Sequence, residues 1–427
     1  MPFGNKKLFL RKIVLHFIYN QLIGLTNLIL PLVGIFSKKI NDFINGRKSA
    51  IEKIKKSFNS EDKIIWIHSS SLGEFEQGIP IIYEIKKTLK EYKILVTFFS
   101  PSGYNAKKNS KEVDLVTYLP LDSPKNARKF LDAFCPKLVI LIKYEFWPNY
   151  LIELNKRKIS VISVSSIFRP PQFLFNNIFK NYQKILSTIS HFFVQNKESK
   201  SLLNSIGINQ VTISGDTRFD RVYEFINRNN ELELIDSFIK NEFCFVAGST
   251  WSEDYNLMDK LFISKKNEKI IIAPHDVSAK SLKVLEKKIK KPYTKWSSYN
   301  KKIDSNKNIL IIDIIGVLTK VYSYASLVYV GGGMGKKGLH NILEPAVFGV
   351  PIIIGKNYSK FKEASDLVKK RGVFKVESKN NFIMKYKEFF DDKIARQKAG
   401  KINHNYVKDH TGASKIIKEY MTKVLSN

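Results

Sequence analysis

The feature that most constrains this chain is an alternation, from residue 60 onward, of short apolar runs with longer amphipathic stretches. The runs have the length of strands, and the stretches between them carry the spacing of amphipathic helices. Strands that alternate with helices predict an α/β fold with parallel sheets covered by helices on both faces. The predicted strands are 64–68, 94–99, 115–119, 138–142, 161–164, 192–194 and 211–214 in a first series, and 243–247, 270–273, 309–312, 327–330 and 352–354 in a second.

A polar, helix-like stretch at residues 219–241 separates the two series and predicts a domain boundary. A chain of 427 residues is long enough for two or three domains. We expect two Rossmann-like domains that face a cleft, with ligands beyond the carboxyl ends of the strands. The expected division is an N-terminal anchor segment at 1–45, a first domain at 46–225, a second at 226–390 and C-terminal helices at 391–427.

The N-terminal segment contains an uncharged stretch from Ile13 to Ser37, most of it Leu, Ile, Val or Phe. As a helix, its 25 residues would be about 37 Å long, enough to cross a bilayer. A signal peptide and a soluble core helix are the competing interpretations, but no small-residue cleavage site follows. Basic residues on both sides favour attachment to an anionic membrane surface, spanning or lying on it. They are Lys6, Lys7, Arg11, Lys12, Lys38 and Lys39.

The chain has 71 Lys and Arg residues against 39 Asp and Glu, a formal net charge of +32 spread along its whole length. Diffuse positive charge indicates a membrane surface or nucleic acid nearby, although a composition biased toward Lys, Ile and Asn gives the same excess. Only two cysteines, Cys135 and Cys244, exclude a disulfide scaffold and a zinc ribbon. Both stand in apolar runs, so we expect buried thiols.

The loop after the 64–68 strand contains three serines and a glycine before Glu74, where a helix opens. Small residues let a substrate approach the backbone, and a helix N-terminus favours an anion there. Glu74 is therefore placed to act as a general base. The alternative is that it only complements the helix dipole, as acidic residues of a first turn often do.

Two further loops of the first half carry candidate charges. Glu145 follows the 138–142 strand with Lys143 beside it, which suits either the rim of a cleft or a local ion pair. Arg218 follows the 211–214 strand, where a guanidinium could meet an anionic substrate or form an interdomain salt bridge with Asp216 or Asp220.

In the second half, the 327–330 strand ends in the run Gly-Gly-Gly-Met-Gly, and a helix is predicted near Asn341 after a short basic loop. Backbone N–H groups at such a turn can hold a phosphate, and Glu344 could hold ribose hydroxyls. The spacing matches neither a dinucleotide fingerprint nor a P-loop. No Asp-x-Asp pair stands at a suitable strand end, so we expect no metal site.

At these loops the sequence resembles the 3-deoxy-D-manno-octulosonic acid (Kdo) transferases of lipopolysaccharide biosynthesis, which are inverting glycosyltransferases of the two-Rossmann-domain GT-B type. The resemblance covers nearly the whole chain, and the shared order and spacing of its segments carry it. These segments are 71–74 (Ser-Leu-Gly-Glu), 97–103, 119–122, 145–149 (Glu-Phe-Trp-Pro-Asn), 215–220, 248–250 and 340–345.

The resemblance implies transfer of Kdo from CMP-Kdo to a lipid A precursor (lipid IVA) at the cytoplasmic face of the bacterial inner membrane, with no cofactor and no nucleic-acid partner. It implies that Glu74 is the general base, that Glu145 belongs to the catalytic set, and that Arg218 replaces a basic residue, usually Lys, that supports the transition state. The residues that it places around CMP are Pro274, His275, Ile315, Gly316, Val317, Asn341, Ile342, Leu343 and Glu344.

Two departures from the family pattern stand out. Lys143 occupies a position where the family often has an acid, and Pro274 one where the donor-binding turn commonly carries Arg. Two other functions compete: a GT-B enzyme that uses a UDP-sugar and a lipid or peptidoglycan acceptor, and a non-catalytic basic protein that binds membrane or nucleic acid. Such a binding protein would show one continuous basic face with exposed aromatics, whereas the lysines here are diffuse. The number of Kdo residues added is not encoded in any motif.

Overall fold

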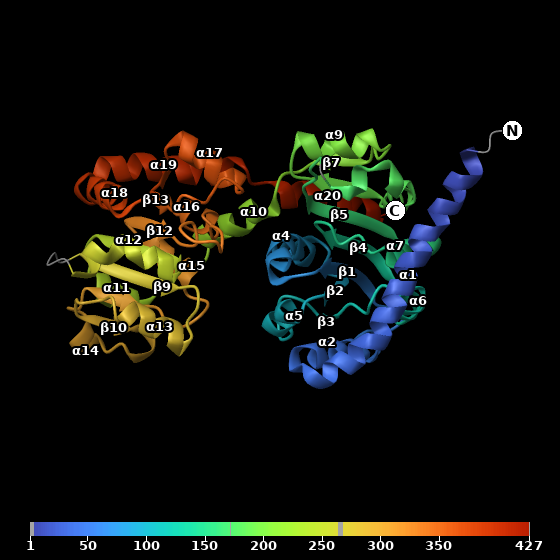
Figure 1. Cartoon of the computed structure of the whole chain (residues 1–427), viewed down its shortest axis with the longest axis horizontal. Helices are drawn as coiled ribbons and strands as arrows, with labels where there is room; N and C mark the ends of the chain where they lie inside the picture. The colour runs from blue at the N-terminus through green and yellow to red at the C-terminus, as the bar shows by residue number, and fades with distance from the viewer. Residues whose placement is uncertain (1–3, 171, 264–267, 427) are drawn as a thin grey trace. The chain divides into compact units, whose positions relative to one another are not determined.

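The structure is a computed structural model that describes residues 4–170, 172–263 and 268–426 (Figure 1). The chain forms two compact units, the first from Met1–Arg221 and Gly412–Asn427 and the second from Val222–Thr411. Each unit contains one seven-stranded sheet, and every described strand pair in it is parallel. Two parallel sheets confirm the predicted α/β class.

The first sheet has the strand order β3-β2-β1-β4-β5-β6-β7. β1 and β4 are central neighbours, with His68 of β1 opposite Leu141 of β4. Because parallel strands end at the same edge, the loops that follow these two strands begin side by side. The strands are β1 (Lys63–Ser69), β2 (Tyr92–Phe98), β3 (Leu115–Tyr118), β4 (Pro136–Ile142), β5 (Ser160–Ser166), β6 (His191–Val194) and β7 (Val211–Ile213).

Helices cover both faces of this sheet, and two apolar clusters form its core. α20 (Ala413–Ser426) returns to this unit from the far end of the sequence, and its Ile417 and Met421 are buried in the same cluster as Ile79 and Ile82 of α4. The other helices of the unit are α2 (Lys38–Lys48), α3 (Ala50–Ser57), α4 (Leu72–Thr88), α5 (Pro101–Lys107), α6 (Pro124–Asp132), α7 (Pro148–Lys156), α8 (Lys180–Leu186) and α9 (Lys197–Ser205), with short 3₁₀ turns η1 (Phe173–Phe175) and η2 (Asn177–Phe179).

The second sheet has the order β10-β11-β9-β8-β12-β13-β14. Its edge strands β10 (Tyr293–Lys295) and β14 (Val373–Lys375) were not predicted, because each has three residues and ends in a lysine rather than forming an apolar run. The other strands are β8 (Cys244–Thr250), β9 (Lys269–Pro274), β11 (Ile309–Ile311), β12 (Leu327–Val330) and β13 (Ile352–Ile354).

Helices also cover the second sheet, and they include α19 (Lys393–Asp409). The sequence-based division grouped α19 with α20 in one C-terminal segment, whereas the structure assigns the two helices to different units. α10 (Thr217–Tyr223) contains the change of unit. The remaining helices are α11 (Glu233–Ile239), α12 (Ser252–Ile263), α13 (Ala279–Glu286), α14 (Lys301–Asp304), α15 (Leu318–Val321), α16 (Leu343–Ala346), α17 (Lys362–Lys370) and α18 (Lys379–Asp391), with 3₁₀ turns η3 (Glu224–Ile226), η4 (Trp296–Ser298) and η5 (Tyr322–Tyr324).

The N-terminal segment is one helix, α1 (Gly4–Phe36), which continues through Pro31. Its portion His16–Phe36 is long and apolar enough to cross a membrane, and only 6% of its most apolar window is buried. The side chains of Lys6, Lys7, Arg11, Lys12 and Lys39 lie outside the described residues.

The expectation of two buried thiols is half wrong. Cys244 on β8 is buried, but Cys135 is exposed. Cys135 stands one residue before β4 begins, so it precedes the apolar run that the strand buries.

Candidate active site

Glu74 stands in the first turn of α4, just beyond the carboxyl end of β1. Ser71 caps this helix: its hydroxyl accepts the N–H of Glu74 at 3.4 Å, and Glu74 Oε2 accepts the N–H groups of Ser70 at 2.6 Å and Ser71 at 3.2 Å. This reciprocal pairing is a capping box, so the predicted role at the helix terminus is confirmed. The carboxylate accepts both of its hydrogen bonds through Oε2, and within the part of the chain that the structure describes no hydrogen bond reaches Oε1. The side chain is half-buried.

Glu145 lies in a cluster with His68 and Trp147. Trp147 Nε1 donates to Glu145 Oε2 at 3.0 Å, and His68 Nε2 is 3.3 Å from the same oxygen and 3.2 Å from Trp147 Nε1. The other ring nitrogen, His68 Nδ1, is 2.8 Å from the hydroxyl and 3.1 Å from the carbonyl oxygen of Thr97. The buried imidazole is therefore held from both sides. The expected alternative of an ion pair between Lys143 and Glu145 is wrong, because the described partners of this carboxylate are His68 and Trp147.

Burial, two charged side chains and two backbone N–H groups shift the pKa of Glu74. Burial raises the pKa of Glu74 above its ordinary value, and the negative charge of Glu145 raises it further. The N–H groups of Ser70 and Ser71 and the charge of Lys143 act in the opposite direction and lower this pKa. A carboxylate whose pKa is raised by burial and a second carboxylate is a better proton acceptor than an exposed one.

Lys143 begins the loop after β4 in a left-handed conformation, with φ of 60°. Its N–H donates to Val164 O at 2.9 Å, and its carbonyl oxygen accepts the hydroxyls of Ser163 at 3.3 Å and Ser166 at 2.6 Å. Non-glycine residues adopt this conformation only when their surroundings fix it. Three hydrogen bonds to β5 thus fix the point from which the Lys143 side chain leaves the strand.

Arg218 lies at the start of α10 and is paired within its own loop. Its Nε donates to Asp216 Oδ2 at 2.8 Å, while Asp216 Oδ1 accepts the N–H of Arg218 at 2.9 Å and Nε2 of Gln77 at 3.0 Å. The alternative, an interdomain salt bridge with Asp216 or Asp220, is confirmed in its partner Asp216 but not as an interdomain bridge, because both residues belong to the first unit. The Arg218 side chain is 37% exposed. Because Gln77 belongs to α4, this helix connects the Arg218 loop to the turn that carries Glu74.

The sheet order therefore brings the three predicted catalytic residues to one helix and its neighbouring loops. Glu74 and Glu145 follow the adjacent strands β1 and β4 and interact electrostatically. Arg218 follows β7 at the edge of the sheet and reaches α4 through Asp216. His68 was missed as a partner of this site, although it ends the same apolar run that places Glu74.

In the second unit, three rings stack where β8, β9 and β12 end. The His275 ring lies 4.7 Å from Trp251 and 4.4 Å from His340, centroid to centroid, with interplanar angles of 28° and 24°. Trp251 Nε1 donates to His340 Nε2 at 2.9 Å, so this nitrogen accepts and the ring proton belongs on Nδ1. Burial, and next the charge of His275, lower the pKa of His340 to about 4, so this ring is neutral at pH 7.

The glycine-rich turn after β12 is tied to the Trp251 loop by Asp254. This buried carboxylate accepts the N–H groups of Trp251 at 2.9 Å and Gly332 at 3.0 Å and the Tyr329 hydroxyl at 2.7 Å. Gly332 has φ of +88°, and a side chain at Gly331 would clash with the carbonyl oxygen of Ser249. The turn therefore needs glycine both for its conformation and for the close approach of the β8 backbone.

The residues 341–344, which were predicted to surround the donor, differ in whether their side chains are available to a ligand. Asn341 Nδ2 donates to Glu344 Oε1 at 3.1 Å, and its Oδ1 accepts the N–H of Leu343, where α16 begins two residues later than predicted. The side chains of Ile342 and Leu343 are buried in the core, so only their backbone is available to a ligand.

The segment 315–317 follows β11, and Pro274 ends β9. Ile315 is 85% exposed, and Gly316 has φ of +101°. Ring contacts join His275, which follows Pro274, with His340. Trp251 was not among the predicted site residues, and the signal for it was its position in the loop after the predicted strand 243–247.

Two units with seven-stranded parallel sheets define the GT-B class, and solved structures share this fold. A UDP-GlcNAc 2-epimerase from Neisseria meningitidis matches with a TM-score of 0.61 at 17% identity, covering 84% of this chain and 100% of its own. A glycosyltransferase from Rickettsia africae matches with a TM-score of 0.54 at 13% identity, covering 86% of this chain and 100% of its own. At these identities the likeness shows the fold alone.

Sequence relatives narrow the class. The family model described as 3-deoxy-D-manno-octulosonic-acid transferase (kdotransferase) matches residues 45–221. The 3-deoxy-D-manno-octulosonic acid transferase of Aquifex aeolicus is 26% identical over 79% of this chain and 89% of its own length, and that of Haemophilus influenzae is 27% identical over 82% and 84%. A bifunctional glycosyltransferase/methyltransferase of Fusobacterium nucleatum is 28% identical over 81% of this chain, but the match spans only 55% of that protein.

Residues 45–221 thus match the model of the Kdo transferase family. The predicted resemblance to these glycosyltransferases of lipopolysaccharide biosynthesis is confirmed over about four fifths of the chain.

Proposed function

We propose that this chain transfers Kdo from CMP-Kdo to a lipid A precursor, lipid IVA, with inversion at the anomeric carbon and Glu74 as the general base. The observation that carries the proposal is the Glu74 carboxylate. Its Oε2 holds the start of α4, its pKa is raised by burial and by Glu145, and it stands in a segment that matches the Kdo transferase family. One carboxylate can thus cap a helix and accept a proton.

In the proposed step, the acceptor hydroxyl oxygen forms a bond to the anomeric carbon of Kdo. The bond from that carbon to the phosphate oxygen of CMP breaks, and its electron pair leaves with CMP. The hydroxyl proton passes to Oε1 of Glu74, since Oε2 accepts two backbone N–H groups. Glu145 keeps the pKa of Glu74 raised and is itself held by His68 and Trp147.

Arg218 would face negative charge on the donor. Kdo carries a carboxylate and its leaving group a phosphate, and a guanidinium binds either one through paired N–H groups. The Asp216 carboxylate fixes Nε of Arg218, and Gln77 fixes Asp216, so the planar group is oriented before substrate arrives.

The second unit would hold CMP. The stacked faces of His275 and Trp251 suit a flat base, and neutral His340 offers a ring N–H as donor. The glycine turn supplies backbone N–H groups for the phosphate, and Asn341 and Glu344 suit ribose hydroxyls. A CMP leaving group needs only fixed donors and cations for its charge, so the proposal includes no resident metal or cofactor.

We further propose that the protein works at the cytoplasmic face of the inner membrane, attached through α1. The apolar helix His16–Phe36 and the net charge of +32 support this location. The acceptor is an anionic lipid, and each cation near an anionic surface contributes about 1 kcal/mol of attraction. No nucleic-acid partner is part of the proposal.

Mass spectrometry of the acceptor tests the reaction. Purified full-length protein in detergent is incubated with lipid IVA and freshly generated CMP-Kdo. A gain of one or more Kdo masses is expected and also counts the additions, while reactions without protein or with CMP alone should give none. If no Kdo is added but a UDP-sugar is transferred, the proposed donor is wrong.

A further inference from the structure

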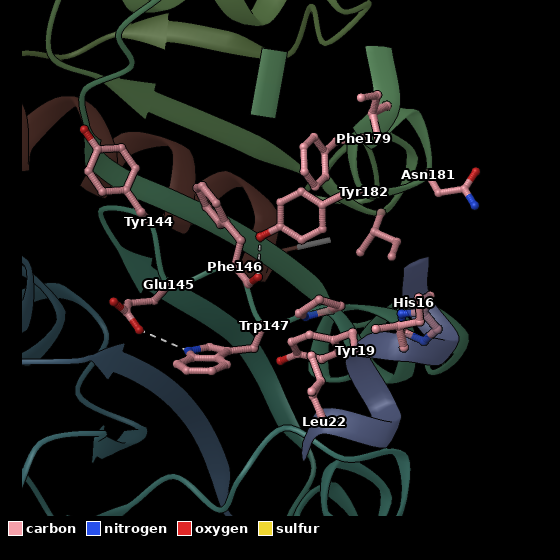
Figure 2. Close-up of a pocket in the computed structure, with 14 residues that line it drawn as sticks. His16, Tyr19, Leu22, Tyr144, Glu145, Phe146, Trp147, Phe179, Asn181 and Tyr182 are labelled. Carbon is pink, nitrogen blue, oxygen red and sulfur yellow. Dashed lines mark hydrogen bonds between the residues drawn. The ribbon is translucent and has the colours of Figure 1, made fainter. Parts of the chain in front are cut away.

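The first unit contains an apolar pocket of about 490 Å³ between α1, the loop 144–148 and the region of η2 and α8. Figure 2 shows its lining, with His16, Tyr19 and Leu22 of α1 on one side and Glu145 and Trp147, joined by their hydrogen bond, on the other. The volume lies within the range of sites that bind organic ligands. Glu145 is the single Asp, Glu, Lys or Arg in the described lining.

Specific hydrogen bonds hold the walls of the pocket together. On α1, Tyr19 donates its hydroxyl to Asp122 Oδ2 at 2.8 Å, and Asn20 Oδ1 accepts Nδ2 of Asn149 at 2.9 Å. Asp122 also accepts the N–H groups of Asn149 and Tyr150, which open α7 directly after the Glu145 loop. These bonds dock α1 on the loop that carries Glu145.

The opposite wall is fixed in a similar way. The Tyr182 hydroxyl of α8 donates to Phe146 O at 2.6 Å, a bond drawn in Figure 2. The pocket is therefore built by hydrogen bonds on both sides and does not depend on the apolar lining alone to stay in place.

The position of the pocket connects two features of this unit. At one end, Glu145 is close enough to Glu74 to raise its pKa. At the other, Ile18 and Leu22 are 45% and 57% exposed and belong to the helix that is long and apolar enough to cross a membrane. An apolar chain that enters along α1 would thus lead to the neighbourhood of the candidate base.

We propose that this pocket binds one acyl chain of the acceptor lipid, so that α1 forms a wall of the acceptor site as well as an anchor. This inference rests on the proposed function. A sugar or nucleotide would bury hydroxyl groups without hydrogen-bond partners against such a lining. An acyl chain has no hydrogen bonds to water to give up, so its burial there carries no such cost. The acceptor is favoured over bulk phospholipid because the pocket ends beside Glu145, which places the attached sugar near Glu74.

Kinetics provide the first test. Leu22→Trp adds an indole to the lining, and Leu28→Trp adds the same group to the same helix at a position that is 74% exposed and outside the lining. We expect Leu22→Trp to raise the KM for the acylated acceptor about tenfold. The ratio of kcat/KM for the acylated acceptor to kcat/KM for a deacylated acceptor should therefore fall. Leu28→Trp should match the wild type. Equal KM values for the two variants would overturn the proposal.

Fluorescence quenching provides a second test that needs no catalysis, so it decides the pocket even if Kdo transfer fails. An acceptor with brominated acyl chains should quench the fluorescence of Trp147. The contribution of Trp147 is obtained by subtracting the fluorescence of Trp147→Phe from that of the wild type. Unbrominated acceptor should reverse the quenching, and excess phosphatidylethanolamine–phosphatidylglycerol vesicles should not. Quenching by brominated phospholipid that the acceptor cannot displace would assign the pocket to bulk lipid, and absence of Trp147 quenching would show that no chain enters. Either result overturns the proposal.

Discussion

At the carboxyl edge of the first sheet the prominent groups are carboxylates, Glu74 and Glu145, held by backbone N–H groups, an imidazole and an indole. At the carboxyl edge of the second sheet they are flat rings and glycines: Trp251, His275 and His340 stack, and a glycine turn packs against β8. The two sheets have the same number of strands and the same parallel arrangement.

The two sheets share one architecture, but the side chains at their carboxyl edges suit different chemical tasks. Burial and Glu145 raise the pKa of Glu74, which prepares this edge to accept a proton. Burial lowers the pKa of His340, which keeps this ring neutral at pH 7 and suited to stacking and hydrogen bonding. The proposed function therefore divides between the two units, with proton transfer in the first and donor binding in the second, and each prediction below tests one side of that proposal.

The largest expected effect is on turnover. Glu74→Gln should lower kcat by about 10²- to 10⁴-fold, as expected for loss of a general base. Glutamine preserves a capping box at this position, so thermal unfolding should change little. Glu76→Gln is the matched control, because this carboxylate of α4 pairs with Lys107 and Arg221 instead. Normal turnover by folded Glu74→Gln would remove the base from the account.

A change in the ring cluster of the second unit should alter the KM for the donor CMP-Kdo. His275→Ala removes the ring that stacks on both Trp251 and His340, and we expect the KM for CMP-Kdo to rise about 5- to 150-fold, the range for loss of one base-stacking contact. The KM for the acceptor should stay unchanged. His191→Ala, in the first unit, is the control and should leave the donor KM as it was. A rise in acceptor KM alone would contradict the division of roles.

The pH profile tests the two charges beside Glu74. Glu145 raises the pKa of Glu74 and Lys143 lowers it. Because the base must be ionised, kcat/KM falls as the pH drops through that pKa. Glu145→Gln should therefore move the acid limb to lower pH, and Lys143→Met should move it to higher pH. Shifts in the same direction would show that these residues act on the profile in some other way.

The smallest effect concerns the docking of α1. Tyr19→Phe removes one hydrogen bond to Asp122 and should lower the free energy of unfolding by about 1–2 kcal/mol. Burial raises the pKa of Asp122 to about 6, so the carboxylate is charged in the native state only above that pH. Its usual pKa is about 4, so the native state binds more protons between the two values, and this group's contribution to stability falls as the pH rises.

Since the Tyr19 bond favours the charged carboxylate, the deficit of Tyr19→Phe should be larger at pH 8 than at pH 5, as urea unfolding would show. Tyr92→Phe is the control, because this hydroxyl donates to the carbonyl oxygen of Leu425. A deficit that does not change with pH would contradict the pairing with an ionised Asp122.

The fold could be predicted in large part from the sequence because buried parallel strands are apolar on both faces and stand out as short runs. The strands missed, β10 and β14, are edge strands of three residues with a polar end. Strand order could not be predicted, because nothing in a run such as 138–142 says which strand pairs with it. The adjacency of β1 and β4, which brings Glu74 and Glu145 together, is therefore a finding of the structure.

The sequence predicted which loops carry the candidate site, but it did not predict which side chains contact the site residues. A role of Glu74 at the helix terminus follows from local position, so it was one of two open alternatives, whereas the capping box itself is a finding of the structure. The pairing of Glu145 with His68 joins residues 77 positions apart, and no local pattern encodes it. Tyr19 and Asn20 interrupt an otherwise apolar segment, and only the structure shows that these polar residues dock α1 on Asp122 and Asn149.

The most direct test of the division between the two edges is calorimetric titration of CMP into wild type, Glu74→Gln and His275→Ala. The account predicts that Glu74→Gln binds CMP as tightly as the wild type while its transfer activity is lost, and that His275→Ala binds CMP more weakly. Weaker CMP binding by Glu74→Gln, or unchanged binding by His275→Ala, would contradict it.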